Sequence, residues 1–279
     1  MIHRLKEIMG GVSWAFRFSN PCEILLTRHF FRRKRSVTIE HGGLQMLIDS
    51  QTSDAQAVTE VLLEGMYDSA IRRAAEDRPA FSYLNLGANI GAFDVRIFEL
   101  LRSQCQRITG IAVEMNPATH ARLLLNLELN NLRSVQAINA AAWDTAGVTH
   151  VRIEDRNTGQ QCGGEDDVAE GWSVPLLPWR ELFEKASATP VDLVKIDIEG
   201  AERKVVPQMT EADRQRIRFL VIETHGSDVR QQVAAHLQLI GFQQSHEKPG
   251  DGETWLTLWQ NPHTPPSSAT QNQMGGARE

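Results

Sequence analysis

The chain has 279 residues, of which 41% are hydrophobic and 23% are charged. This composition is typical of a globular protein that buries a sizeable core, and it excludes collagen-like, disordered and membrane-embedded chains. The formal net charge of -6 argues against a general nucleic-acid binder, but the charge is uneven, because the first 35 residues carry +6 and the rest carry -12.

The three cysteines, Cys22, Cys105 and Cys162, have no paired spacing. They therefore fit neither a disulfide framework nor a structural zinc site. No apolar run approaches the ~20 residues that a transmembrane helix needs. Charged residues also interrupt the region where a secretory signal would be apolar. We expect a cytoplasmic protein with no transmembrane segment.

The N-terminal part, residues 1–50, is expected to be a basic extension made of helices and a hairpin. The hairpin strands are residues 36–40 and 44–48, which flank a His-Gly-Gly turn. After the extension, the apolar spacing of residues 53–75 predicts one helix, and Ser53 begins a capping-box pattern at its start.

From residue 81 onward, strands alternate with helices, and the helix after the second strand has Asn116 as its N-cap and Pro117 at its first position. Near-continuous apolar strands of this kind favour a parallel sheet with helices on both faces. Two final strands without a helix between them predict an antiparallel hairpin. The expected strands are residues 81–86, 108–113, 135–141, 191–196, 219–224, 242–246 and 254–259.

We therefore expect an α/β fold with a seven-stranded, mostly parallel sheet and an antiparallel C-terminal hairpin, within one domain at residues 51–260. Residues 154–172 form an acidic, Gly-rich insertion whose length is typical of a functional loop. Residues 261–279 contain almost no apolar side chains, so we expect a disordered tail.

The turn after the first strand contains the first group of candidate binding residues: Asn85, Gly87, Asn89 and Gly91. Gly87 permits a sharp turn and close approach of a ligand, and Gly91 lets the next helix approach the sheet. The helix start offers free N–H groups to an anionic part of the ligand. The spacing matches neither a dinucleotide fingerprint nor a P-loop, and two glycines in a tight turn also have a purely structural explanation.

Two acidic residues extend this candidate site. Glu114 ends the second strand, 27 residues after Gly87, where a carboxylate can accept both ribose hydroxyls of an adenosine ligand. Its structural alternative is a solvated glutamate that caps the next helix. Asp144 follows the third strand and could accept the exocyclic amine of adenine, or it could serve only the turn that it begins.

The ends of the fourth and fifth strands carry the candidate catalytic residues. Asp197 and Glu199 follow the fourth strand, at the edge where parallel sheets bind ligands. We assign the nearby Glu202 to the positive start of the next helix. His225 ends the fifth strand and could take a proton near neutral pH, although many such histidines only face solvent.

The segments LNLGANIGAF, AVEMNP, AAWDTAG, DLVKIDIEGAE and VIETHG together resemble the FkbM family of S-adenosylmethionine-dependent methyltransferases, over roughly residues 50–245. The resemblance implies a Rossmann-like class I methyltransferase fold and O-methylation of a sugar, polyketide or related secondary metabolite. The residues that would hold S-adenosylmethionine are Asn85, Gly87, Asn89, Gly91, Glu114 and Asp144. The family usually has aspartate at the position of Asn85, so a carboxylate is missing there.

The same resemblance implies that Asp197 and Glu199 face the transferred methyl group. Because Asp197 and His225 stand at the ends of strands that we expect to be adjacent, they are our candidates for the base. The sequence requires no metal, although Mg²⁺ held by Asp197, Glu199 and Glu223 is an alternative. An alternative from another class is a non-catalytic adenosine-ligand-binding module that docks on RNA or an anionic surface through the basic residues 28–35. The acceptor, a small molecule or glycan, and the oligomeric state stay open.

Overall fold

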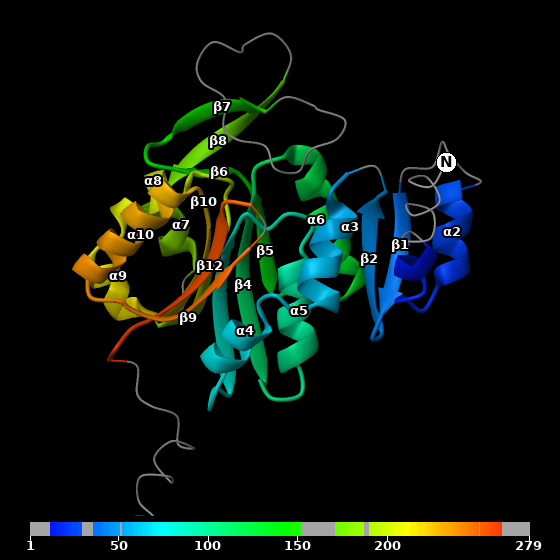
Figure 1. Ribbon diagram of the computed structural model, residues 1–279, viewed down its shortest axis with the longest axis horizontal. Helices are drawn as coiled ribbons and strands as arrows, with labels where there is room; N and C mark the ends of the chain where they lie inside the picture. The colour runs from blue at the N-terminus through cyan, green and yellow to red at the C-terminus, as the bar shows by residue number, and fades with distance from the viewer. Residues whose placement is uncertain are drawn as a thin grey trace, which may run out of the picture.

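The computed structural model describes residues 12–29, 36–50, 52–151, 171–186, 190–250 and 252–263. Seven strands form one sheet in the order β11-β12-β10-β9-β3-β4-β5 (Figure 1). Five of these strands are parallel, and β12 runs antiparallel to both β10 and β11. The expected α/β sheet with its antiparallel C-terminal hairpin is confirmed. The strands are β3 (Ala80–Leu86), β4 (Arg107–Glu114), β5 (Val135–Asn139), β9 (Val191–Ile196), β10 (Ile217–His225), β11 (Gln243–Pro249) and β12 (Thr254–Gln260).

The strand order contains a reversal in the middle of the sheet. From β3 the chain adds β4 and β5 on one side, then crosses over to add β9 and β10 on the other side of β3. In open parallel sheets, ligands bind beyond the carboxyl ends of the strands at such a reversal. The ends of β3 and β9 therefore define where a site is expected.

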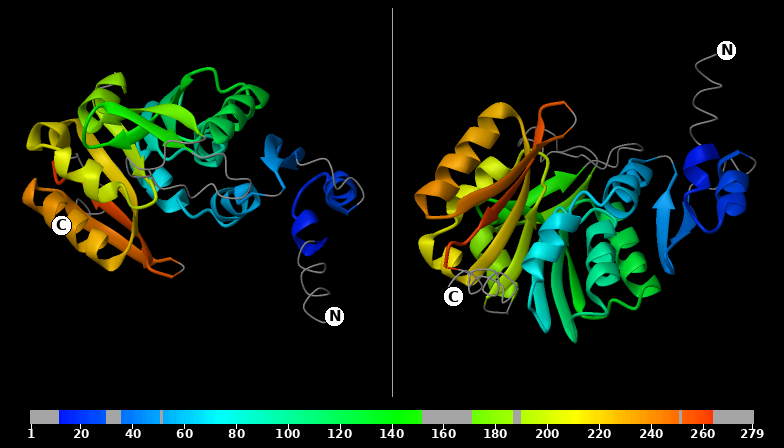
Figure 2. Two further views of the ribbon diagram at one scale, coloured as in Figure 1. Left: turned by 90° about the horizontal axis from the view of Figure 1, so that it is seen from above. Right: turned by 60° about the horizontal axis from the view of Figure 1, so that its bottom comes forward.

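Helices cover both faces of the sheet (Figure 2). The alternation of side chains in β3 shows why: Phe81 and Tyr83 pack into the core on one face, and Leu84 and Leu86 into the core on the other. The first face is covered by α4 (Asp68–Ala74), α5 (Ala92–Leu101) and α6 (Pro117–Leu129). The second is covered by α7 (Trp179–Lys185), α8 (Glu202–Val205), the 3-10 turn η2 (Val206–Gln208) and α10 (Ser227–Leu239), with α9 (Glu211–Arg216) between η2 and β10.

The predicted N-terminal hairpin is present as β1 (Ser36–His41) and β2 (Leu44–Asp49), preceded by α2 (Pro21–His29). Asn126 of α6 attaches it to the sheet domain: its amide oxygen accepts the Leu47 N–H at 2.6 Å, and its amide nitrogen donates to the carbonyls of Leu47 and Ile90 at 3.1 and 2.8 Å. Apolar residues of the hairpin belong to the core of the first sheet face. One hydrophobic core therefore includes side chains from both sides of residue 50, the boundary expected between the N-terminal extension and the sheet domain.

The predicted single helix at residues 53–75 is wrong. The segment contains α3 (Asp54–Val58), the π-helical turn η1 (Thr59–Leu63) and α4. Gly65, at φ +66°, lies in the break between η1 and α4, and the apolar spacing continues across that break. Ser53 makes no capping bond; the carboxylate of the buried Asp54 accepts the Asp49 N–H instead, at 2.8 Å.

The predicted third strand is divided between β5 and β6 (Ala141–Trp143). Asn139 ends β5, because its side chain donates to the carbonyls of Glu114 and Met115. β6 belongs to a separate three-stranded sheet with β7 (Gly147–Val151) and β8 (Trp172–Pro178), which the sequence did not predict.

Several predicted segments fall outside the described residues: most of the acidic insertion, most of the basic run at residues 28–35, and the tail from residue 264. In the part of the chain that the structure describes, no helix combines the length and apolar character needed to cross a membrane.

Candidate active site

A cavity of about 270 Å³ opens beyond the carboxyl ends of β3, β4, β9 and β10. Its position matches the reversal in strand order. Four separate chain segments, the end of β10 and the helices α8 and α10 contribute its walls. The lining residues are Gly87 and Asn89 after β3; Val113, Glu114 and Met115; Ala140, Ala141, Ala142 and Trp143; Asp197, Ile198, Glu199, Gly200 and Ala201 after β9; and Arg203, His225 and Val229.

The turn after β3 is fixed by backbone contacts. The N–H groups of Gly87 and Ala88 both donate to the Val113 carbonyl, at 3.0 and 2.9 Å. Gly87 adopts φ +77°, and a Cβ at this position would lie only 1.7 Å from the Asp197 carbonyl oxygen. Glycine is therefore required here by the packing of β9 against the turn, in addition to any ligand approach.

Gly91 has a different neighbour from the one expected. It precedes α5 at φ +86°, and a Cβ there would lie 2.7 Å from Leu123 Cδ1 of α6. The close approach that this glycine permits is thus between the turn and α6, not between α5 and the sheet.

Glu114 lies in the cavity wall with 7% of its surface exposed. One carboxylate oxygen accepts the Asn89 N–H and the other accepts the Asn116 N–H, both at 2.8 Å. Burial raises the pKa of Glu114 to about 7, against the opposing effect of these two hydrogen bonds. A carboxylate has about four acceptor positions, so each oxygen can still accept one hydroxyl from a ligand.

Asn85 is fully buried and lies outside the cavity lining. Its amide nitrogen donates to Asp94 Oδ2 at 2.8 Å, and its amide oxygen has no hydrogen-bond partner among the described residues. Asp94, on α5, also accepts the Tyr83 hydroxyl at 2.9 Å, and burial raises its pKa to about 6. The Asp94 carboxylate, on the helix that follows the strand, therefore lies next to the Asn85 amide.

Asp144 also lies outside the cavity lining, although its neighbour Trp143 is part of it. The Lys204 ammonium donates to Asp144 at 2.9 Å and lowers the pKa of that carboxylate. The same ammonium lies 5.6 Å from the centre of the Trp143 ring. Lys204 therefore holds Asp144 against α8, beside the wall formed by Trp143.

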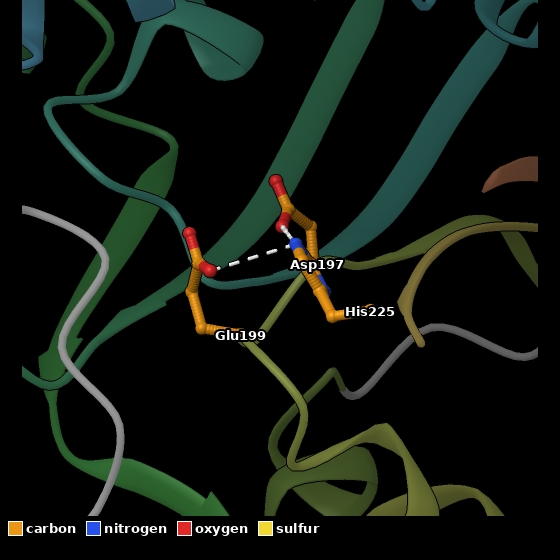
Figure 3. A group of neighbouring side chains, drawn as sticks. All are labelled: Asp197, Glu199 and His225. Carbon is orange, nitrogen blue, oxygen red and sulfur yellow. Dashed lines mark ion pairs between the residues drawn. The ribbon is translucent and has the colours of Figure 1, made fainter. Parts of the chain in front are cut away.

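Asp197, Glu199 and His225 come together, as the sequence predicted from their strand ends. Figure 3 shows the imidazole pointing toward both carboxylates. His225 Nε2 lies 3.5 Å from Glu199 Oε2 and 3.9 Å from Asp197 Oδ1. On the other side of the ring, Nδ1 lies 3.1 Å from Glu202 Oε1.

The neighbouring carboxylates determine the protonation state of His225. Burial lowers its pKa, but the hydrogen bond to Glu202 and the charges of Glu202, Asp197 and Glu199 outweigh burial and raise the pKa to about 9. At neutral pH His225 is therefore an imidazolium, which donates protons and has no free lone pair to accept one.

Glu202 has a larger part in the site than the sequence suggested. It is fully buried, and its Oε1 accepts the N–H groups of Ile198 and Gly200 at 3.0 and 3.2 Å in addition to facing His225. It thus supports the loop that carries Glu199. The helix-start role that we expected explains none of these contacts.

Sequence reasoning also missed Tyr67 and Lys195. The Tyr67 hydroxyl donates to Asp197 Oδ2 and Glu223 Oε2, at 3.3 and 3.4 Å. Burial and these carboxylates raise the pKa of Tyr67 well above its ordinary value, so the phenol stays protonated. Burial and the charge of Asp197 raise the pKa of Glu223 to about 7. The sequence offered one signal for Lys195, namely the presence of a charged ammonium within a mostly apolar strand, β9.

The ligand atoms of Asp197, Glu199 and His225 lie within 4.8 Å of one another, a spacing compatible with a divalent cation. Glu223, which the sequence-based alternative included, is not in this group and faces Tyr67 instead.

The sequence profile described as "Methyltransferase FkbM domain" matches residues 85–248. No curated protein matches the chain. Among solved structures, the chain is similar to precorrin-6y C5,15-methyltransferase from Geobacter metallireducens GS-15, with TM-score 0.40 and 11% identity over 68% of this chain and 85% of that one. It is also similar to Aeropyrum pernix fibrillarin in complex with S-adenosyl-L-methionine, with TM-score 0.46 and 13% identity over 80% of this chain and 82% of that one.

Proposed function

The chain belongs to the FkbM family of S-adenosylmethionine-dependent methyltransferases, and from that premise we propose that its acceptor atom is a hydroxyl oxygen of a sugar, polyketide or related secondary metabolite. One observation supports this most directly: Asp197 and Glu199 line the same cavity as Glu114. A carboxylate that can accept a proton therefore lies beside the residues proposed to hold the cofactor.

The described residues fit S-adenosylmethionine. Glu114 keeps acceptor positions for two ribose hydroxyls, and apolar side chains such as Val113 and Trp143 offer a surface for adenine. Gly87 and Asn89 line the cavity, whereas Asn85 is buried outside its lining, so in this proposal the turn would need to move before the unpartnered Asn85 amide oxygen could accept from a ligand ammonium. In this proposal, Asp144 would need to leave Lys204 to reach the adenine amine.

S-adenosylmethionine supplies a methyl group that is already activated by the sulfonium charge. The protein must therefore mainly orient the acceptor oxygen and exclude water. We assign removal of the hydroxyl proton to Asp197, because His225 already holds its proton at neutral pH. His225 then orients the carboxylates of Asp197 and Glu199 from between them.

The acceptor proposal can be tested with a methyl-labelled donor and fractionated metabolite extracts. Mass spectrometry should find the label on a hydroxyl oxygen, and Asp197→Asn should lose at least about a hundredfold of the transfer rate, which is the usual contribution of a general base. Label on nitrogen or carbon would refute the hydroxyl assignment, and full activity of Asp197→Asn would refute the assigned base.

We propose that transfer needs no metal. The spacing of Asp197, Glu199 and His225 is the observation that favours a metal-assisted variant. With an acceptor in hand, dialysis against EDTA should leave the rate unchanged. A loss that Mg²⁺ or Mn²⁺ restores would instead support the metal-assisted reaction.

Two further proposals concern the location of the protein and the role of its basic N-terminal run. We propose a cytoplasmic location, and weak contact of the basic run at residues 28–35 with RNA or an anionic membrane. Ala15, Phe18 and Ile24 are buried in the core, so deleting residues 1–35 would also remove core side chains. Replacing Arg32, Arg33, Lys34 and Arg35 by glutamine is the cleaner test, and it should abolish RNA or vesicle binding at low salt.

A further inference from the structure

Lys195 lies where the turn after β3 meets the carboxylate cluster. Only 4% of the residue is exposed. Its ammonium donates to the Gly87 carbonyl at 2.7 Å and lies 3.1 Å from Asp197 Oδ2. The same group lies 5.6 and 5.9 Å from the ring centres of Tyr67 and Phe93. One side chain therefore contacts both the turn proposed to hold the cofactor and the proposed base.

A buried ammonium is costly unless it is paired and hydrogen-bonded. The other side chains of β9 are all buried too, and four of the remaining five are apolar. The single lysine in this strand therefore requires its partners. The structure supplies them from the Gly87 carbonyl and the Asp197 carboxylate, while the faces of two aromatic rings surround the charge.

The two carboxylate oxygens of Asp197 have different neighbours among the described residues. Oδ2 receives both Lys195 and the Tyr67 hydroxyl, and Tyr67 comes from the segment just before α4. Oδ1 lies on the side of His225, at 3.9 Å from Nε2. Two donors from different elements thus fix the carboxylate and leave its second oxygen toward the cavity that Asp197 lines.

The backbone already brings Gly87 and Asp197 together. The Asp197 N–H donates to the Leu86 carbonyl at 3.1 Å, and the Asp197 carbonyl packs against the Gly87 Cα. Lys195 adds a side-chain connection between the same two places. A shift of the turn therefore moves the Gly87 carbonyl, which accepts from the Lys195 ammonium. The same ammonium holds Asp197 Oδ2, so the shift also acts on that carboxylate.

We propose that Lys195 is a positioning residue that couples the Gly87 turn to the Asp197 carboxylate, so that the cofactor-binding turn and the proposed base keep one fixed arrangement. The proposal rests on the proposed function, in which these two places serve the same cofactor. It assigns Lys195 no contact with the reacting atoms.

The test is a double-mutant cycle measured by calorimetric binding of S-adenosylmethionine and S-adenosylhomocysteine to the full chain, which needs no acceptor. The four proteins are the unsubstituted chain, Lys195→Met, Asp197→Asn and the double variant. Loss of a charged hydrogen bond should raise the Kd for S-adenosylmethionine by about tenfold in Lys195→Met. Lys185→Met, at an exposed position on α7, is the control and should bind as the unsubstituted chain does.

If Lys195 acts through Asp197, the loss in the double variant should be at least about threefold smaller than the product of the two single losses. A lysine that affects cofactor binding only through the Gly87 turn, and not through Asp197, would give multiplicative losses, and that result would overturn the proposal. If Lys195→Met does not fold, as judged by thermal unfolding, Lys195→Gln, which also removes the charge, takes its place in the same cycle and is judged by the same criterion.

The two hypotheses fail in different ways. If the unsubstituted chain bound neither compound, the cofactor site of the proposed function would be refuted. If the unsubstituted chain binds and the losses multiply, only the coupling role of Lys195 is refuted.

Discussion

Gly87 shows how one residue can satisfy two requirements. Its backbone forms the turn at φ +77°, and its missing side chain admits the Asp197 carbonyl. The two candidate sites that the sequence suggested separately, after β3 and after β9, are therefore in direct backbone contact. A substitution at this position should disturb both sites at once.

We predict that Gly87→Ala destabilises the protein by more than about 3 kcal/mol, because left-handed strain adds to a clash with backbone that cannot move aside. Gly43→Ala is the matched control, since Gly43 has φ +79° but nothing within 4 Å of a new Cβ. Strain alone should cost about 1–2 kcal/mol there. Equal losses in urea denaturation would show that the contact with Asp197 does not matter.

The raised pKa of Glu114 predicts how the affinity for the cofactor depends on pH. Burial raises its pKa to about 7, and only the ionised form can accept both ribose hydroxyls. As pH falls through that pKa, the competent fraction falls, so the Kd for S-adenosylmethionine at pH 6 should be roughly tenfold that at pH 8. Glu114→Gln should bind weakly and lack this component of the pH dependence. The same pH profile in Glu114→Gln and the unsubstituted chain would assign the effect to another group.

Several site residues could be predicted from the sequence because strand ends can be recognised locally. Glu114, Asp197 and His225 each end an apolar run, and parallel strands bring such ends together. The contact of Tyr67 with Asp197 joins residues 130 positions apart, through a helical segment whose path the sequence did not reveal. Glu202 lies in the first turn of α8 as predicted, but its hydrogen bonds to the loop before that helix were missed, because no periodicity reports a loop conformation.

At the scale of elements, local capping chemistry separates a correct prediction from a wrong one. The side chain of Asn116 accepts the N–H groups of Ala118 and Thr119 at the start of α6, as its position before Pro117 predicted. Ser53 has an equally good sequence pattern but makes no capping bond. The difference is tertiary, because the neighbouring Asp54 is buried and paired with Arg122 at 2.8 Å.

This contrast gives a paired prediction. Asn116→Ala should lower the free energy of unfolding by about 1 kcal/mol, the usual cost of losing a cap. Ser53→Ala should change it by less than about 0.5 kcal/mol, as expected for a position that makes no special contact. Chemical denaturation of both variants measures the difference, and a loss at Ser53 as large as that at Asn116 would contradict the contacts described for α3.

At the scale of the molecule, the sheet could be predicted and the attachment of the N-terminal hairpin could not. Alternating strands and helices, closed by a hairpin, leave few possible topologies. The hairpin itself was recognised from its turn, but its docking uses the side chains of Asn126 and Asn130, which bond the backbone of Leu47 and Gln45. Isolated polar side chains of this kind give no signal in the sequence.

We predict that Asn126→Ala lowers the free energy of unfolding by about 2–3 kcal/mol, because it leaves the buried Ile90 carbonyl and the part-buried N–H and carbonyl of Leu47 without their partner. Thermal unfolding should remain one cooperative transition, since the hairpin shares its core with the sheet. Leu125→Ala, at an exposed position of α6, is the control and should have little effect. A separate early transition in Asn126→Ala would instead mark the hairpin as an independent unit.

The central claim is that the cavity at the strand ends holds S-adenosylmethionine through Glu114. Thermal unfolding of the full chain with S-adenosylmethionine, and separately with NAD, tests this most directly. At a donor concentration of 100 times its Kd, the protein should gain about 2.7 kcal/mol of stability. NAD should give no gain, and Glu114→Ala should lose most of the gain from the donor. Stabilisation by NAD but not by S-adenosylmethionine, or an undiminished donor effect in Glu114→Ala, would contradict the claim.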